Sequence, residues 1–208
     1  MWRIRWTARA VAASAAAVCA TVAVAQPATS GESTDATLVL AGGCFWGVEA
    51  VFEHVNGIRS VVSGYARYET RTSRSDVPIE AVRIVYDPSL VARQQLLEIF
   101  FTVAHDPTSR DAQGPDRGPE YRAVVFHENE DDRGASEAYR AQLERQRRFT
   151  RPIVTEIQPL ASFVIAEPAH QDYAARHPND AYIVQNDAPK LSHLQRQFPA
   201  LYRSRRAP

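Results

Sequence analysis

Hydrophobic residues along the chain recur at two spacings, one typical of buried strands and one typical of helices with a single buried face. Short apolar runs bounded by Gly, Pro, Asn or Asp predict strands at residues 37–41, 58–65, 79–86, 121–127 and 153–157. Helices are predicted at residues 45–55, 90–103, 128–148 and about 191–198. Asn56-Gly57 is a stop signal for the first helix, and Ser89 is placed to cap the second.

The order of these elements is β-α-β-β-α-β-α-β, with neither an internal repeat nor a second domain. This order predicts one domain of the α+β or α/β class, a two-layer sandwich with a mixed sheet. We expect a ferredoxin-like plait at its core. Residues 105–120 form a long loop rich in Asp, Gly and Pro, and such a loop inside a compact domain is usually functional.

The N-terminal segment differs from the rest of the chain. Three arginines precede a charge-free stretch at residues 10–25, which ends in Ala23-Val24-Ala25, with small residues where signal peptidase needs them. The alternative is a membrane anchor, but the stretch is shorter than the roughly 20 apolar residues that span a bilayer. We therefore expect a signal peptide at 1–25, a flexible lead-in at 26–36 and a domain at 37–208, secreted to the periplasm or cell envelope.

The charge balance and the number of cysteines exclude some classes of function and favour others. Lys and Arg number 24, as do Asp and Glu, and loss of the three N-terminal arginines would leave a net charge of −3. A nucleic-acid-binding protein would show a basic excess instead. Cleavage would also remove Cys19, leaving Cys44 as the only cysteine. A lone thiol in an oxidising compartment has no internal partner, which suggests a reactive group.

Cys44 follows a predicted strand and Gly42-Gly43, at the first turn of a predicted helix. Backbone N–H groups and the helix dipole at that position favour an anion, so we expect the thiol pKa to be lowered. The adjacent aromatic residues Phe45 and Trp46 suit an apolar substrate group. From the residues alone, a catalytic nucleophile and a small buried hydrophobic residue remain equal alternatives.

The string Gly42-Gly43-Cys44-Phe45-Trp46-Gly47-Val48-Glu49 resembles the active-site signature of the A-type peptide methionine sulfoxide reductases. Later blocks resemble that family in the same order, and the resemblance runs from about residue 38 to 183. These blocks are Gly64-Tyr65, residues 80–88, His105-Asp106-Pro107, residues 114–122, and His170-Gln171-Asp172-Tyr173 with His177-Pro178.

The resemblance implies a thiol-dependent reduction of the S epimer of methionine sulfoxide, free or in proteins. Cys44 would attack the sulfur and become a sulfenic acid, and Glu80 would protonate the oxygen. Asp116 and Tyr121 would hold the oxygen through hydrogen bonds or water. A carboxylic acid beside aromatic rings stays protonated near pH 7 because desolvation raises its pKa.

Phe45 and Trp46 would seat the methyl group, and Glu49 is expected to be structural. The sequence departs from the family in a loop, between Tyr65 and Glu80, that is shorter than usual. Many members carry a further oxygen-binding tyrosine in this loop, and Tyr68 is a candidate replacement that the resemblance does not align.

A second departure concerns turnover. Many members reduce the sulfenic acid with one or two C-terminal cysteines, but no cysteine follows Cys44 here. The resemblance therefore implies an external thiol reductant, such as thioredoxin or a thioredoxin-like protein, and a transient mixed disulfide. It implies no metal and no other cofactor. We expect a monomer whose partners are oxidised proteins or free methionine sulfoxide and the reductant.

Three other interpretations remain open. A cysteine hydrolase or acyltransferase would use His105 or His170 as its base. A metal site could be built from His170, His177 and His193, although their spacing fits no common motif. A non-enzymatic binding module of the cell envelope would keep its function without Cys44.

Overall fold

The computed structural model describes residues 1–2, 35–70, 72, 75 and 77–204. The chain divides into two units, Met1–Glu32 and Ser33–Pro208. Of the expected signal peptide, only Met1 and Trp2 are described, and both are exposed. Of the expected lead-in, only residues 35 and 36 are described, and the rest of both segments lies outside the described residues. In the part of the chain that is described, no helix has the length and apolar character needed to cross a membrane.

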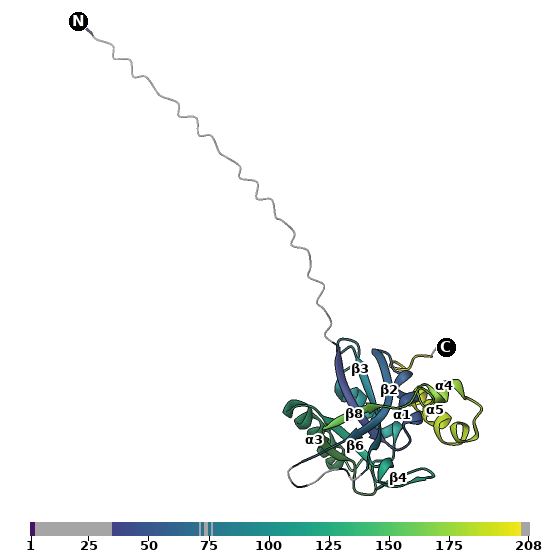
Figure 1. Ribbon diagram of the computed structural model, residues 1–208. Helices are drawn as coiled ribbons and strands as arrows, with labels where there is room; N and C mark the ends of the chain where they lie inside the picture. Colours follow the sequence, from purple (N-terminus) through teal and green to yellow (C-terminus); the bar gives the residue numbers. More distant parts are fainter. Residues whose placement is uncertain (3–34, 71, 73–74, 76, 205–208) are drawn as a thin grey trace. The chain divides into compact units, whose positions relative to one another are not determined.

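The folded unit is a single α+β domain built on a six-stranded mixed sheet (Figure 1). The strand order is β7-β6-β1-β3-β2-β8, in which β6 and β7 are parallel and the other neighbours are antiparallel. The strands are β1 Ala36–Gly42, β2 Ile58–Arg67, β3 Ile79–Tyr86, β6 Ala123–His127, β7 Glu156–Pro159 and β8 Ser162–Ile165. A separate two-stranded hairpin pairs β4, Ala112–Gln113, with β5, Asp116–Arg117.

Helices pack on this sheet and at its end. They are α1 Phe45–Glu53, α2 Arg93–Ile99, α3 Glu130–Arg145, α4 Tyr173–Arg176 and α5 Ala188–Gln197. Shorter turns are the π-helix η1 Phe100–Ala104, the 3₁₀ helix η2 Pro119–Tyr121 and the π-helix η3 Ile183–Asp187. Figure 1 shows α1, α4 and α5 gathered together, with α3 at the other end of the domain.

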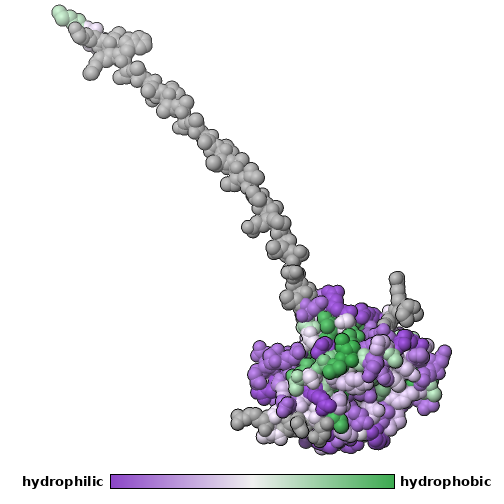
Figure 2. Space-filling model, in the orientation of Figure 1, coloured by the Kyte–Doolittle hydropathy of each residue, from purple (hydrophilic) through white to green (hydrophobic). Residues whose placement is uncertain are grey.

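The sequence of β1 is a continuous run of apolar residues because both faces of this strand are buried. Leu38 and Leu40 point into a core shared with α1, α2 and η1, whereas Val39 and Ala41 point into a second core on the opposite face. Successive strand residues face opposite sides, so a strand covered on both faces needs apolar residues at every position. The edge strand β8 is less covered, and Figure 2 shows hydrophobic side chains gathered over β2 and β8.

The expected strands at 37–41, 58–65 and 79–86 coincide with β1, β2 and β3. The expected cap at Ser89 is wrong, because the Ser89 N–H and hydroxyl both donate to Asp87 Oδ1 in a turn. The second helix instead begins at Arg93, after Ala92, and widens into the π-helix η1 at its end. Local capture of a polar side chain by a turn competes with helix capping.

Other boundaries also differ from the prediction. Tyr121 belongs to η2 rather than to a strand, because Pro119 begins a short helix before β6 starts at Ala123. The strand expected at 153–157 lies at Glu156–Pro159, and the segment expected to be irregular contains β8, α4 and η3. These last elements are only four or five residues long, too short for a hydrophobic period to establish itself.

Candidate active site

Two glycines place Cys44 at the N-terminus of α1. Gly43 has a φ of +88°, and a Cβ there would lie 2.4 Å from the Gln113 side chain. A Cβ on Gly42 would lie 3.0 Å from the Phe100 ring. Only glycine fits both the left-handed backbone and the close approach. The chain therefore turns sharply from β1 into α1, with Cys44 as the N-cap residue and 8% of its surface exposed.

Glu80 lies beside this helix end. It is on β3, the neighbour of β1, and its Oε2 accepts a hydrogen bond of 3.0 Å from the Phe45 backbone N–H. Burial raises the pKa of the Glu80 carboxyl to about 7, and the negative charges of Asp116 and Glu120 add to this effect. The Phe45 hydrogen bond opposes it. The carboxyl can therefore hold a proton near neutral pH, as a general acid must.

The Cys44 thiol is protonated in the free protein, contrary to the expected lowering of its pKa. Burial raises the thiol pKa to about 12, and the Glu80 carboxylate raises it further. The Trp46 backbone N–H and the Tyr182 hydroxyl lower it, but by less. The expected effect of the helix N-terminus is thus present, and desolvation outweighs it because the sulfur has little contact with water.

Tyr121 and Asp116, the two residues that the family resemblance names beside Glu80, lie within electrostatic range of the same cluster. The pKa of the Tyr121 hydroxyl is raised to about 12. Burial is the largest cause, and the negative charges of Glu80, Asp116 and Cys44 are the next largest. The Tyr121 hydroxyl is therefore close enough to feel the charges of both Glu80 and Cys44. Asp116 is in the β4–β5 hairpin, which the long loop at 105–120 forms around the site.

Tyr182 is a site residue that the sequence reasoning missed. Its hydroxyl donates a hydrogen bond to Asp116 Oδ2 and faces the Cys44 sulfur, and its pKa is raised mainly by burial. Its ring meets Trp46 edge-on, with centroids 5.8 Å apart. Tyr182 is 66 residues from Asp116, and no motif around it signals chemistry.

Aromatic rings form one wall of the site. Trp46 stacks on Tyr173 with ring centroids 3.8 Å apart, and His170 stacks on Trp46 at 5.8 Å. Phe45 lies 5.7 Å from Tyr65 and 5.5 Å from His170. Such a wall suits a small apolar group held close to Cys44.

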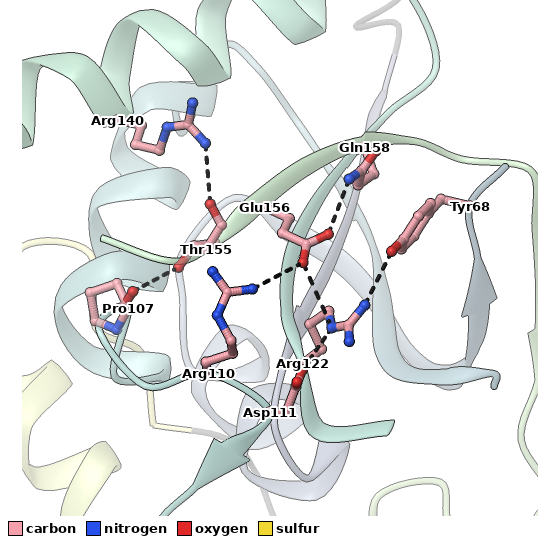
Figure 3. A network of polar contacts seen from close by, with 9 residues as sticks. All are labelled: Tyr68, Pro107, Arg110, Asp111, Arg122, Arg140, Thr155, Glu156 and Gln158. Atoms are coloured by element: carbon pink, nitrogen blue, oxygen red, sulfur yellow. Dashed lines mark hydrogen bonds and ion pairs between the residues drawn. The ribbon is translucent and has the colours of Figure 1, made fainter. Parts of the chain in front are cut away.

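The tyrosine beside the acid is Tyr65, on strand β2, and not Tyr68. Tyr65 on β2 is the direct cross-strand partner of Glu80. The pKa of the Tyr65 hydroxyl is raised by burial, then by the charge of Glu167, and then by the charge of Glu80. Tyr68 is 4% exposed and packs in the second core. Its hydroxyl accepts a hydrogen bond of 3.1 Å from Arg122, in a network with Asp111 and Glu156 (Figure 3).

The histidines do not have the environment of a catalytic base. The His105 ring is stacked on Phe100, its Nδ1 is 2.8 Å from Phe100 O, and its Nε2 is 2.9 Å from Thr155 Oγ1. Burial lowers its pKa to about 4. His170 belongs to the aromatic wall beside Trp46. Both nitrogens of His105 are therefore engaged by Phe100 and Thr155, so neither is free to take a proton from Cys44.

Glu49 and its neighbours hold the aromatic wall. Glu49 Oε2 accepts a hydrogen bond of 2.9 Å from the Asp172 backbone N–H, which fixes the segment carrying Tyr173 against α1. Among the described residues, the group of three or more side chains spaced for a metal ion is Glu49, Glu53 and Asp172. That group does not contain the histidines that the sequence offered as ligands.

Comparison with known proteins identifies the family. Residues 36–201 match the family model described as peptide methionine sulfoxide reductase. Peptide methionine sulfoxide reductase MsrA 2 of Mesorhizobium japonicum is 44% identical over 80% of this chain and 89% of its own length. MsrA of Natronomonas pharaonis is 41% identical over 78% of this chain and 95% of its own length.

Solved structures agree with these relatives. Reduced Mxr1 of Saccharomyces cerevisiae has a TM-score of 0.62 and 30% identity, covering 70% of this chain and 87% of its own. Methionine sulfoxide reductase A of Corynebacterium diphtheriae has a TM-score of 0.58 and 29% identity, covering 71% and 77%. With the cysteine, the acidic residue and the aromatic wall in one cluster, the chain belongs to the peptide methionine sulfoxide reductase family, as an MsrA-type enzyme that reduces methionine sulfoxide to methionine.

Proposed function

We propose that the enzyme reduces the S epimer of methionine sulfoxide, free or in proteins, through Cys44 as nucleophile and Glu80 as proton donor. The observation that carries this proposal is the hydrogen bond from the Phe45 N–H to Glu80, because it holds the acid at the helix end that presents the cysteine. A sulfoxide oxygen is a poor leaving group until it is protonated, so acid and nucleophile must meet at one sulfur.

The two pKa shifts give this pair a shared proton. The pKa of Glu80 is about 7 and that of Cys44 is about 12. At a pH between these two values, Glu80 and Cys44 together carry one proton. Transfer of that proton to the sulfoxide oxygen leaves the Cys44 sulfur as a thiolate that attacks the substrate sulfur. The oxygen and the transferred proton end on Cys44 as a sulfenic acid, and methionine is released.

The surrounding side chains would orient the substrate. Phe45 and Trp46, backed by Tyr173, would seat the methyl group. Asp116 and Tyr121, which surround Cys44 with Glu80, would hold the oxygen through hydrogen bonds or water. Tyr182 and Tyr65 supply two further hydroxyls next to these groups.

Regeneration would use an external thiol and no metal or organic cofactor. No cysteine follows Cys44, and cleavage after Ala25 would remove Cys19, so the sulfenic acid of the mature protein would have no internal partner. A crystal structure of the yeast relative Mxr1 in complex with Trx2, 26% identical with a TM-score of 0.50, supports a thioredoxin-type reductant. The enzyme would act as a monomer and form a mixed disulfide with this partner.

We also propose a cleaved signal peptide at 1–25, a lead-in at 26–36 and a domain at 37–208 that works in the periplasm or cell envelope. The family match begins at residue 36, which supports a domain start close to this position. N-terminal sequencing of the exported protein should begin at Gln26. An intact Met1 on the mature protein would contradict the proposal.

The domain core is proposed to be a ferredoxin-like plait. The order β6-β1-β3-β2 with antiparallel neighbours, and α1 and α2 in the two crossover connections, supports this assignment. The strands β7 and β8 would then be additions at the two edges of the plait.

Racemic methionine sulfoxide tests the reaction. With excess thiol, the purified enzyme should stop at about half conversion because it takes one epimer, and chiral chromatography should show the R epimer left over. Cys44→Ser should produce no methionine. Full conversion, or consumption of the R epimer, would exclude the proposed specificity.

A further inference from the structure

The two edges of the six-stranded sheet differ in how they are protected from pairing with a further strand. The edge strand β7 carries Glu156, which is ion-paired with Arg122, and it ends at Pro159, which has no backbone N–H. The other edge strand, β8, has the sequence SFVI, without a charged residue or a proline. Natural sheets use charges and prolines to block their edges, so the edge at β8 is the unprotected one.

Apolar side chains of β8 are exposed on both faces of the sheet. Val164 and Ile165 are adjacent in the strand and therefore point to opposite faces, and each is 62% exposed. The inner strand β1 is also apolar on both faces, but its residues are buried in two cores. β8 thus has the composition of an inner strand at the edge of the sheet.

The backbone of β8 has hydrogen-bonding groups directed away from the sheet. The Ala166 N–H donates to Ser63 O in the ladder with β2. Hydrogen-bonded pairs recur at every second residue of antiparallel strands, so the N–H and C=O of Val164 also face β2. The corresponding groups of Phe163 and Ile165 face outward. Among the described strands, β8 has a neighbour on one side only.

This open edge lies in line with the proposed acid. Val164 is the direct cross-strand partner of Tyr65, which is in turn the partner of Glu80. Directly opposed residues project from the same face, so Val164 lies on the face that carries Glu80. A strand added outside β8 would be three strand spacings, roughly 14 Å, from β3, and an extended chain covers this distance in about four residues. The edge is therefore continuous with the substrate site.

We propose that the open edge of β8 binds the backbone of an oxidised protein substrate as an added strand, at residues about four or more positions from the methionine sulfoxide. The inference rests on the proposed function and adds a contact that free methionine sulfoxide cannot make. Phe163 and Ile165 would pair with the substrate backbone, and Val164 would pack against an apolar substrate side chain. Backbone pairing supplies affinity whatever the substrate sequence, provided that the segment is extended.

Two pairs of variants of the full enzyme test the edge. Ile165→Pro removes an outward N–H at a position where an edge strand tolerates proline, and Ile165→Ala is its control because it keeps the N–H. Val164→Thr replaces exposed apolar surface by a hydroxyl. Its control is Leu90→Thr, because Leu90 is 59% exposed and lies beside Gly57, beyond the end of α1 that is remote from Cys44.

Steady-state kinetics are measured with dithiothreitol on two substrates, free methionine sulfoxide and a long unstructured peptide with one central sulfoxide. For the peptide, kcat/KM should fall by about tenfold in Ile165→Pro and about threefold in Val164→Thr, through a higher KM. For free methionine sulfoxide, all four variants should stay within about twofold of wild type, which also shows that each is folded. Both control variants should keep the wild-type kcat/KM for the peptide.

Unchanged peptide kinetics in Ile165→Pro and Val164→Thr, or equal losses on the two substrates, would overturn the inference. Sedimentation distinguishes a different occupant of the edge. A wild-type dimer that Ile165→Pro dissociates would assign the edge to a second copy of the chain and would also overturn the inference. A wild-type enzyme that does not reduce free methionine sulfoxide would instead contradict the proposed function.

Discussion

The backbone N–H of Phe45 donates a 3.0 Å hydrogen bond to Glu80 Oε2, although the two residues are 35 positions apart. This bond ties the acid on β3 to the first turn of the helix that Cys44 begins. The Glu80 charge then acts directly on the cysteine and raises its thiol pKa. Cys44 and Glu80, the proposed nucleophile and acid, are therefore coupled, and substitution of Glu80 should change the titration of Cys44.

Glu80→Gln should slow the sulfoxide step by about 10²–10⁴-fold, the usual effect of removing a positioned general acid. The same substitution should lower the Cys44 thiol pKa, because it removes the second-largest cause of the upward shift. Single-turnover kinetics measure the first effect, and the ultraviolet absorbance of the thiolate against pH measures the second. A near-wild-type rate, or an unchanged thiol titration, would place the proton donor elsewhere.

The pH dependence of the sulfoxide step should follow the shared proton. Below pH of about 7 both groups are protonated and no thiolate forms, so the rate should fall as pH decreases through the Glu80 pKa. Above that pH the pair holds one proton and the rate should be level, because the thiol titrates only near 12. Stopped-flow measurements of kcat/KM over this range provide the test, and a bell-shaped profile centred on pH 7 would contradict it.

Counting cysteines predicts the product of oxidation. Without reductant, excess sulfoxide should give one methionine per enzyme and a sulfenic acid on Cys44 that dimedone traps, because the chain downstream offers no second thiol. Mass spectrometry of the trapped protein gives the stoichiometry. A burst of two methionines, or an oxidised enzyme that dimedone does not label, would require another resolving group.

Protein stability should decrease as pH rises through the Glu49 pKa. Burial raises the pKa of this folded-state carboxyl from 4.5 to about 7, so its protonated form favours folding at low pH, and this contribution is lost as pH increases from about 4.5 to 7. Glu49→Gln keeps an oxygen for the Asp172 N–H and should make the protein more stable at pH 8 by on the order of 1–3 kcal/mol. Urea unfolding at pH 5 and pH 8 measures this, and equal stabilities of wild type and variant at pH 8 would disprove it.

Two glycines form a matched pair for a stability test. A Cβ on Gly47 would lie 2.0 Å from Asp187 Oδ1, so Gly47→Ala should destabilise the protein by about 1–3 kcal/mol and displace the segment that carries Tyr182. Gly134 in α3 has nothing within 4 Å of such an atom, so Gly134→Ala should stabilise by about 0.5–1 kcal/mol. Thermal unfolding distinguishes the two, and the same sign for both would refute the packing argument.

The only methionine of the chain is Met1, so removal of a signal peptide would leave an enzyme without the residue it repairs. With Cys44 protected as a mixed disulfide, such an enzyme should tolerate hypochlorite doses that inactivate ordinary proteins. Leu97→Met, a near volume-conserving change at a position 1% exposed, should lower that tolerance while leaving untreated activity almost unchanged. Equal survival of both proteins would mean that the absence of methionine does not protect the enzyme.

The sequence alone singled out Cys44 as a candidate nucleophile and located much of the sheet. β1, β2 and β3 were predictable because their apolar residues fill cores close to them, and Gly42-Gly43-Cys44 marked the turn into α1. The acid, Asp116 and Tyr121 came from resemblance to a family rather than from any local pattern. Short elements such as β8 and α4 were missed, since four residues are too few to show a period.

Only the tertiary structure determined whether Cys44 is protonated and which residues surround it. A helix N-terminus favours a thiolate, but the depth of burial, which depends on packing from distant segments, raises the thiol pKa instead. The same packing brings Tyr182 to Asp116 across 66 residues and turns Tyr68 away toward Arg122. A sequence states which groups are available, whereas solvation and long-range contact, fixed only in the folded chain, determine what each group can do.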